Sequence, residues 1–204
     1  MLEKEGNWHQ LEGTYCQCPV HSADGISRVG LYKRFVNKPD FSASCVSNNK
    51  LGRVTMSPTI IRRAMESDAA ELARLTSQLG YPVSEASIRT RMDRIIGSID
   101  DCLLVAEGQD GELAGWIHGF LCQLLESDYR VEIGGLIVDE RFRRGGIGRG
   151  LVQAIENWAA EHRATELSVR CREERAESHK FYESLSFRHI KTQRVFRKRP
   201  SNAD

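Results

Sequence analysis

An apolar run, a glycine-rich turn and a long amphipathic segment follow one another between residues 131 and 161. After the run ends at Val138, apolar residues recur at the spacing of one helix face, at Ile147, Leu151, Val152, Ile155, Trp158 and Ala159. The pattern predicts a strand, a loop and a helix. Because the first N–H groups of such a helix lack backbone partners and carry the positive end of the helix dipole, the loop is suited to hold an anion.

The spacing of the glycines narrows the choice of anion. A Walker loop requires Lys-Ser or Lys-Thr after its glycines, and neither follows here. A dinucleotide fingerprint requires Gly-x-Gly-x-x-Gly, whereas this chain has glycines at the alternate positions 146, 148 and 150. The remaining pattern, Arg143-x-x-Gly146-x-Gly148, resembles the Arg/Gln-x-x-Gly-x-Gly/Ala pyrophosphate loop of the GNAT acetyltransferase superfamily, which grips the diphosphate of acetyl-CoA.

Length and composition predict one domain with an extension, since 204 residues with 40% hydrophobic residues can bury one full core. Residues 1–55 show no lasting periodicity and are interpreted as a poorly ordered N-terminal extension, and residues 56–204 as the domain. One hypothesis is that the physiological start is Met56, in which case a chain beginning there keeps full stability and acetyl-CoA affinity.

Several classes of partner and location are disfavoured by the sequence. The formal net charge of +1 favours neither nucleic acid nor a membrane surface. No run has the length of a membrane span and the N-terminus does not resemble a signal peptide, so a cytoplasmic location is expected. Six cysteines in a chain of this length fit reduced thiols. Cys16, Cys18, His21 and Cys45 are conceivable zinc ligands, but Cys-x-Cys-x-x-His is not a familiar ligand spacing, and no metal is expected.

The order of elements predicted along the rest of the chain is β, α, α, three strands, α, β, α, β. The predicted segments are a strand at 59–63, a helix from 68 to Gly80, a helix from Ser84 to about 97–99, strands at 102–106, 113–121 and 130–138, the helix after the glycine loop, a strand at 165–170, a helix at 175–185 and strand-like residues at 187–196. The strand-helix-strand unit around the loop implies one parallel pair with a right-handed crossover.

That order is similar to the GNAT order over roughly residues 59–199. Leu136-Ile137-Val138 leads into the loop as the family's fourth strand does, and the run from Phe181 to Phe187 resembles its C-terminal Phe-Tyr-Glu-x-x-Gly-Phe. The segment from Thr59 to Ala64 with Asp68 resembles its opening strand and first cap. The resemblance implies an α/β (α+β) fold with a mixed, mostly antiparallel central sheet, helices on both faces, and one parallel strand pair splayed around the cofactor slot.

The same resemblance implies an acetyl-CoA-dependent N-acetyltransferase that transfers the acetyl group directly to a primary amine. Gly134-Gly135 is interpreted as a bulge that splays the strand, so that its backbone can pair with the pantetheine amides. The positions implied to bind the cofactor are Leu136, Ile137, Val138, Arg143, Arg144, Gly145, Gly146, Ile147, Gly148, Arg149 and Ser178. Arg175 and Ser178 stand where the family often has Asn and Ala, and Ser186 where it usually has Gly.

Two residues are predicted to move protons. Tyr182 is where the family places the acid that protonates the leaving thiolate, and the alternative is a core aromatic whose hydroxyl caps a backbone group. Glu132 lies eleven residues before Arg143, the spacing of the base in histone-type members, and the alternative is a glutamate that faces water. His118 and His179 are expected to be packing or surface residues rather than catalysts.

The acceptor amine is not specified by the sequence. Tyr81 and Tyr129 are the predicted acceptor-binding residues, and small-molecule amines and protein or peptide amines are both open. The basic C-terminal residues are interpreted as a solvated strand face rather than a nucleic-acid site. A homodimer is compatible with the resemblance. A second function stays open on the Arg175 and Ser178 departures, a non-catalytic acyl-CoA-binding sensor or regulatory module.

Overall fold

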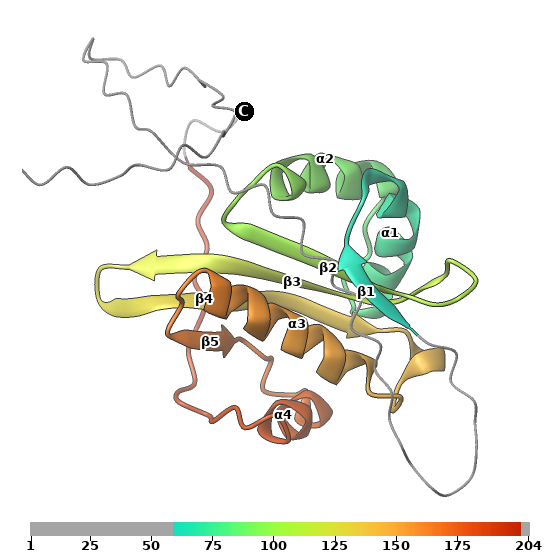
Figure 1. Cartoon of the computed structure of the whole chain (residues 1–204). Helices are drawn as coiled ribbons and strands as arrows, with labels where there is room; N and C mark the ends of the chain where they lie inside the picture. Colours follow the sequence, from blue (N-terminus) through green and yellow to red (C-terminus); the bar gives the residue numbers. More distant parts are fainter. Residues whose placement is uncertain (1–58, 201–204) are drawn as a thin grey trace, which may run out of the picture. The chain divides into compact units, whose positions relative to one another are not determined.

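The computed structural model describes residues 59–200, and in this range five strands form one sheet in the order β1-β2-β3-β4-β5 (Figure 1). The strands are β1 (Ile60–Arg63), β2 (Asp101–Glu107), β3 (Leu113–Leu124), β4 (Ser127–Val138) and β5 (Glu166–Val169). Neighbouring strands are antiparallel except β4 and β5, which are parallel, as predicted. Three interpretations concern residues outside this range: the N-terminal extension, the start at Met56 and the zinc site at Cys16, Cys18, His21 and Cys45.

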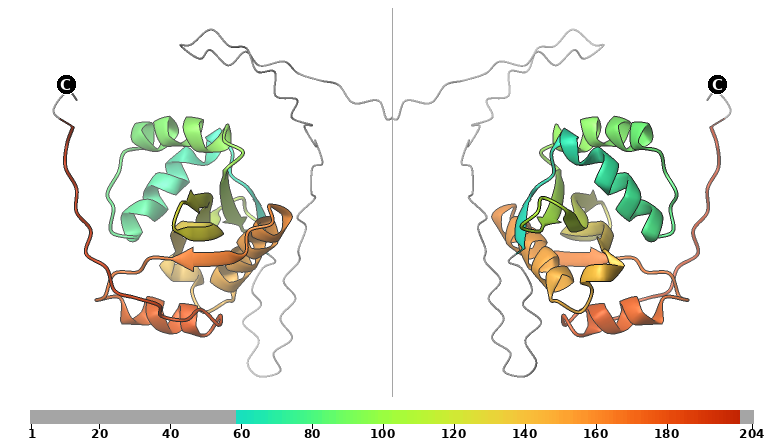
Figure 2. Two further views of the ribbon diagram at one scale, coloured as in Figure 1. Left: turned by 90° about the vertical axis from the view of Figure 1, so that its left-hand side faces the viewer. Right: turned by 90° about the vertical axis from the view of Figure 1, so that its right-hand side faces the viewer.

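Helices cover both faces of the sheet (Figures 1 and 2). One face carries α1 (Ala69–Gln78) and α2 (Glu85–Ile96), and the other carries α3 (Ile147–Glu161) and α4 (Ala176–Glu183). Alternate residues of the strands therefore pack into two cores. On β2, Leu104 packs toward α3, whereas Leu103 and Val105 pack toward α1 and α2. The predicted mixed sheet with helices on both faces is confirmed.

The polar residues at the helix starts have different roles. Ser84 caps α2 as expected, because its hydroxyl accepts from the Ser87 N–H at 3.2 Å. Asp68 does not cap α1. Its carboxylate instead accepts from the Met65 N–H at 2.8 Å and from both terminal nitrogens of Arg62 at 2.8 and 3.0 Å. The first-cap interpretation of Asp68 is thus corrected: the side chain ties the end of β1 to the turn before α1.

The predicted C-terminal strand at 187–196 is wrong. Residues 187–200 have no regular secondary structure and run past the end of the domain as extended chain (Figure 2). Ile190, Val195 and Phe196 are exposed. A strand requires a neighbouring edge for its N–H and C=O groups, and these residues pair with none of the five strands. Strand-like composition alone therefore did not predict pairing.

Candidate functional site

Strand β4 separates from β5 at a bulge in the middle of the sheet. Pairing with β5 ends at Ile133 and Val169, whereas β4 continues to Val138. On the other side of β4, Gly119 pairs with Ile133 and His118 with Gly135, so Gly134 is the extra residue of a bulge. Gly134 is exposed although it belongs to a central strand. The last residues of β4 thus present an unpaired backbone edge on the side toward β5, as the Gly134-Gly135 interpretation predicted.

Gly135 is required by the packing behind the bulge. A Cβ added there would lie 2.7 Å from Cη2 and 2.8 Å from Cζ3 of Trp116. The indole therefore lies directly against the β4 backbone, on the face that carries α1 and α2. Its Nε1 is buried without a hydrogen-bond partner among the described residues. The Trp116 ring therefore packs against the bulge, and only glycine at position 135 leaves space for it.

The loop after β4 has the geometry of an anion cradle. Arg144 (φ 66°) and Gly146 (φ 84°) both adopt left-handed conformations, and Gly146 is the N-cap of α3. No side chain caps this helix, its first turn carries no acidic residue, and a Cβ on Gly146 would meet open space. The N–H groups of Ile147, Gly148 and Arg149 consequently lack intrahelical acceptors. These predicted positions fit a diphosphate, whose charge the helix N-terminus favours.

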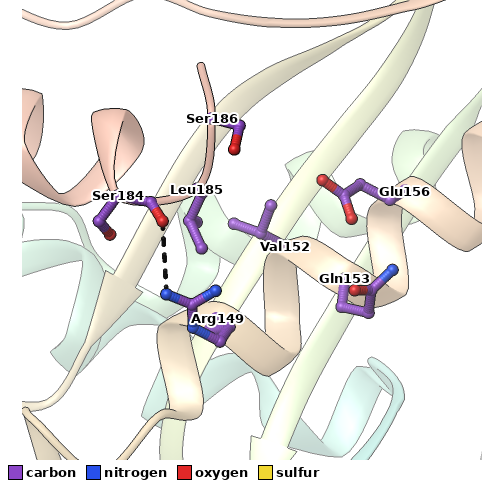
Figure 3. A pocket seen from close by; sticks show the side chains of 7 residues that line it. All are labelled: Arg149, Val152, Gln153, Glu156, Ser184, Leu185 and Ser186. Atoms are coloured by element: carbon purple, nitrogen blue, oxygen red, sulfur yellow. Dashed lines mark hydrogen bonds between the residues drawn. The ribbon is translucent and has the colours of Figure 1, made fainter.

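The arginines of the loop take different directions. The Arg143 Nε donates to the Val138 carbonyl at 3.1 Å, so this side chain folds back onto β4. Arg149 reaches the Ser184 carbonyl at 3.5 Å (Figure 3). It is part of a cavity of about 200 Å³ between α3 and the end of α4, which is lined by Arg149, Val152, Gln153, Glu156, Ser184, Leu185 and Ser186. The Arg149 side chain therefore extends from the first turn of α3 toward the end of α4.

Asp139 anchors the loop, a role that the sequence analysis did not predict. Its side chain is fully buried at the end of β4 and accepts from Arg74 of α1 at 2.6 Å. It also accepts from the Arg141 backbone N–H at 3.0 Å and from the Arg141 guanidinium at 2.8 Å. The hydrogen bonds from Arg141, together with that from Arg74, hold the pKa of this carboxyl well below its usual range. No local spacing could reveal the pair, because Arg74 lies 65 residues away.

Helix α4 carries Tyr182 and Ser178 on one face. A Cβ on Gly148 would lie 3.2 Å from Phe181 and 3.5 Å from Val138, so α4 packs where β4 ends and α3 begins. Tyr182 is 9% exposed and packs edge-on against Phe181 and Phe187. Burial raises the pKa of its phenol, with a smaller contribution from Cys171. Ser178 lies one helical turn before Tyr182 and so shares its face. Tyr182 is thus a protonated, largely buried phenol.

Glu132 lies immediately before the point where β4 and β5 separate. It is 6% exposed, and its two carboxylate oxygens accept from Arg170 Nε at 2.7 Å and from a terminal nitrogen of Arg170 at 3.0 Å. Arg130 is 3.9 Å away. On β5, Ser168 is the partner of Glu132, and its buried hydroxyl has no hydrogen-bond partner within the described range. Glu132 is therefore engaged in a two-point ion pair.

Two arginines join the loop after β5 to the loop after α1. Arg172 donates to the Tyr81 hydroxyl at 3.2 Å and lies over its ring. Arg175 donates to the Leu79 carbonyl at 2.7 Å, where its charge complements the C-terminal end of α1. Tyr81 thus lies beside the splayed strands. Tyr129 lies at the start of β4, where its carbonyl accepts from Thr165, and no hydrogen bond within residues 59–200 joins the two tyrosines.

Two negative findings apply to the described residues. Within residues 59–200, no group of three or more His, Cys, Asp or Glu side chains is arranged to hold a metal ion. In the same range, no helix has the length and apolar character needed to cross a membrane.

Comparison with known proteins identifies the family. The family model described as Acetyltransferase (GNAT) family matches residues 70–187. This match covers the helices, the bulged strand, the glycine loop and the Tyr182 helix. No curated protein sequence matches significantly.

Solved structures share the fold. An aminoglycoside antibiotic 6'-N-acetyltransferase, AAC(6')-Ih from Acinetobacter baumannii, is 22% identical with a TM-score of 0.64, over 70% of this chain and 99% of that chain. The corresponding enzyme AAC(6')-IG from Acinetobacter haemolyticus is 22% identical with a TM-score of 0.62, over 69% and 99%. AAC(6')-Iy in complex with the bisubstrate analogue CoA-S-monomethyl-acetylneamine is 20% identical with a TM-score of 0.63, over 70% and 99%. At these identities the likeness shows the fold alone.

Proposed function

Since the chain belongs to the GNAT acetyltransferase family, we propose that it is an acetyl-CoA-dependent N-acetyltransferase that moves an acetyl group directly from CoA to a primary amine. The observation that carries the proposal is the junction of two features. The bulge at Gly134 leaves the end of β4 unpaired, and the same strand leads into an uncapped helix N-terminus. A ligand with amides at one end and a diphosphate at the other fits that junction.

The cofactor is held chiefly by backbone groups in this proposal. The edge of Leu136, Ile137 and Val138 pairs with the pantetheine amides as an added strand does. The N–H groups from Arg144 to Arg149 receive the diphosphate, including those of Gly145, Gly146, Ile147 and Gly148. Acetyl-CoA supplies an activated acyl group with a thiol as leaving group. Holding this group beside the amine contributes several kcal/mol to lowering the barrier, on the order of the gain from an intramolecular reaction.

Tyr182 is proposed to donate the proton that the departing sulfur requires. A thiolate of pKa about 8.5 leaves, and a phenol that remains protonated at neutral pH is a suitable donor. The burial of Tyr182 supports this role because it raises the pKa of the phenol and keeps the proton in place. Burial also raises the pKa of the nearby Cys171 thiol, which disfavours a thiolate nucleophile and is consistent with direct transfer.

Replacing Tyr182 with Phe tests that role. We expect kcat to fall by about 100-fold, a typical loss for a general acid, with little change in CoA affinity. Turnover that continues unchanged at every pH would rule out Tyr182 as the acid.

The acceptor is proposed to approach from the face that carries α1 and α2, because Tyr81 and its partner Arg172 border the splay on that side. The named acetyltransferases of similar structure act on aminoglycosides, so aminoglycosides belong in an acceptor panel with small amines, amino acids and peptides. Tyr129 is at the far end of β4 and contributes only if the acceptor extends along the strand.

A CoA-binding module without turnover is the second candidate. The observation in its favour is that Arg175, at the position where family members often carry Asn, is used to cap α1 at the Leu79 carbonyl. A pantetheine contact from this position is therefore unavailable in the described arrangement.

One experiment separates the two candidates. The protein is incubated with acetyl-CoA and each member of the amine panel, and free thiol is measured with a chromogenic disulfide, while CoA binding is followed by calorimetry. Amine-dependent thiol release supports the transferase. Binding with no release across the whole panel supports the sensor, and absence of binding contradicts both.

A further inference from the structure

The side chain of His118 lies beside the opening in the sheet. On β3, Gly119 faces Ile155 of α3, so the neighbouring His118 faces the side that carries α1 and α2. A Cβ added to Gly134 would lie 3.5 Å from His118 Nδ1 and 3.2 Å from Phe120. The imidazole therefore stands directly over the exposed residue of the bulge, on the face from which the acceptor is proposed to approach.

Asp101 fixes the tautomer of this imidazole. Its Oδ1 lies 2.8 Å from His118 Nε2. An ionised carboxylate only accepts hydrogen bonds, so Nε2 carries the hydrogen of the neutral ring and Nδ1 carries the lone pair. The side chain of His118 is 21% exposed, which gives water access to it. Within residues 59–200 no hydrogen bond occupies Nδ1, the atom that faces Gly134.

Glu132, the carboxylate nearest to the opening on β4, is less suited to accept a proton. Both of its oxygens accept from Arg170, at 2.7 and 3.0 Å, and its side chain is almost completely buried. Protonating it would break a two-point charge-assisted pair and leave the guanidinium of Arg170 without its partner. His118 has no such partner to lose at Nδ1.

We propose that His118 is the general base of the acetyl transfer and that Asp101 is the residue that positions it. This inference rests on the proposed acetyltransferase function. A primary amine of pKa about 10 arrives mostly as ammonium, and Nδ1 takes one proton from it through a bridging water. The free amine then forms the N–C bond as the C–S bond breaks. As the N–C bond forms, the nitrogen gives its second proton to water, and the sulfur gains a proton from Tyr182, whose phenolate takes a proton back from water. His118 releases the first proton to solvent, so the net products are the amide, the thiol and one proton.

Under this proposal Glu132 has a different task. With Arg170 it holds β4 and β5 together one position before their last pair, Ile133 and Val169. The two candidates for the base, His118 and Glu132, therefore predict opposite effects on kcat when each is replaced with glutamine.

The test compares His118→Gln and Glu132→Gln by thiol release with the best amine of the panel. Glutamine can still donate to Asp101 but accepts no proton. We expect His118→Gln to lower kcat by about 100-fold or more, the usual contribution of a general base, with CoA affinity by calorimetry unchanged. Glu132→Gln is expected to lose less than about tenfold. His189→Ala, which removes an exposed histidine of the C-terminal segment, is the control and should behave as the wild type.

A second readout excludes a merely structural effect. Added imidazole should restore turnover to His118→Ala and should not stimulate Glu132→Gln. The defect of His118→Gln should also shrink with amines of low basicity, which arrive as free amines and do not need the first proton removed.

Four outcomes overturn the proposal. If His118→Gln keeps near-wild-type kcat, or if imidazole fails to restore the alanine variant while its melting temperature is normal, His118 is not the base. If Glu132→Gln alone loses about 100-fold, the base is Glu132. A wild-type protein that binds CoA but acetylates no amine contradicts the proposed function as well, which distinguishes that failure from the others.

Discussion

Asp139 shows how a single buried carboxylate can organise a binding loop from below. It lies at the junction of β4 and the glycine loop, and it receives hydrogen bonds from the loop through Arg141 and from α1 through Arg74. Because a buried charge is stable only when paired, the loop, the strand end and the helix are held in one arrangement.

Replacing Asp139 with Asn should lower stability by about 2–3 kcal/mol near neutral pH, since two charge-assisted hydrogen bonds are lost. The depressed pKa of Asp139 means that its contribution is present above the unfolded value of about 4 and is lost as the pH falls through the folded value. The difference between wild type and variant should therefore narrow in acid. Chemical denaturation at several pH values measures this, with the exposed Glu140→Gln as control.

Tyr182 gives a prediction of the opposite sign. Its raised pKa means that the folded state keeps a proton which the unfolded state releases above about pH 10, so its contribution is present below that pH and is lost as the pH rises. Between pH 10 and 11 the wild type should lose about 1 kcal/mol more than Tyr182→Phe. Parallel thermal melts of the two proteins test this. Identical alkaline slopes would indicate that the phenol ionises freely in the folded state.

At the scale of the elements, the glycines of β4 have separate tasks. Gly134 is the extra residue of the bulge and is exposed, whereas Gly135 admits the ring of Trp116 against the backbone. Gly134 thus forms the bulge at which β4 separates from β5, and Gly135 allows Trp116 to pack against the β4 backbone. A continuous β-branched strand would stay paired with β5 and present no free edge.

Gly135→Ala should destabilise the protein by about 1–3 kcal/mol, because the new Cβ forces the indole out of its place. The double variant with Trp116→Phe should recover part of the loss, since the smaller ring leaves room for the methyl group. Gly108→Ala, in the turn between β2 and β3, serves as the matched control, because its Cβ would make only an ordinary contact, 3.6 Å from the Glu112 carbonyl oxygen. Full stability of the single variant would show that Trp116 is easily displaced.

At the scale of the whole molecule, the two halves of the sheet in the described domain have different structural roles. The antiparallel strands β1 to β3 join the two cores, and the parallel pair β4 and β5 opens toward the ends of α1, α3 and α4. The proposed ligand would contact the end of β4, the start of α3 and helix α4 at the same time. Binding should therefore stabilise the fold as a whole.

CoA at about 100 times its Kd should add about 2.7 kcal/mol of stability, which raises the melting temperature by about 5–10 °C. Pantetheine, which lacks the diphosphate, should give a much smaller shift at the same concentration because the loop at the start of α3 stays empty. Scanning calorimetry with both ligands makes the comparison. Equal shifts would contradict the assignment of the glycine loop to the diphosphate.

The local sequence pattern was sufficient to predict the family, the order of most of the elements and the position of the glycine loop. Hydrophobic periodicity marks helices and strands, and the spacing from Arg143 to Gly148 reflects a backbone shape that glycine permits. The bulge could be predicted for the same reason. The C-terminal strand could not, because pairing depends on a partner edge rather than on the segment itself.

The tertiary structure alone decided which charges meet. Asp139 and Arg74 are 65 residues apart, Glu132 and Arg170 are 38 apart, and His118 and Asp101 are joined by strand register across β2 and β3. The sequence nominated Glu132 and set His118 aside, since residue type and spacing do not reveal which partner a side chain has. Proton transfer depends on those partners, because a neighbouring charge or hydrogen bond determines whether a lone pair is free.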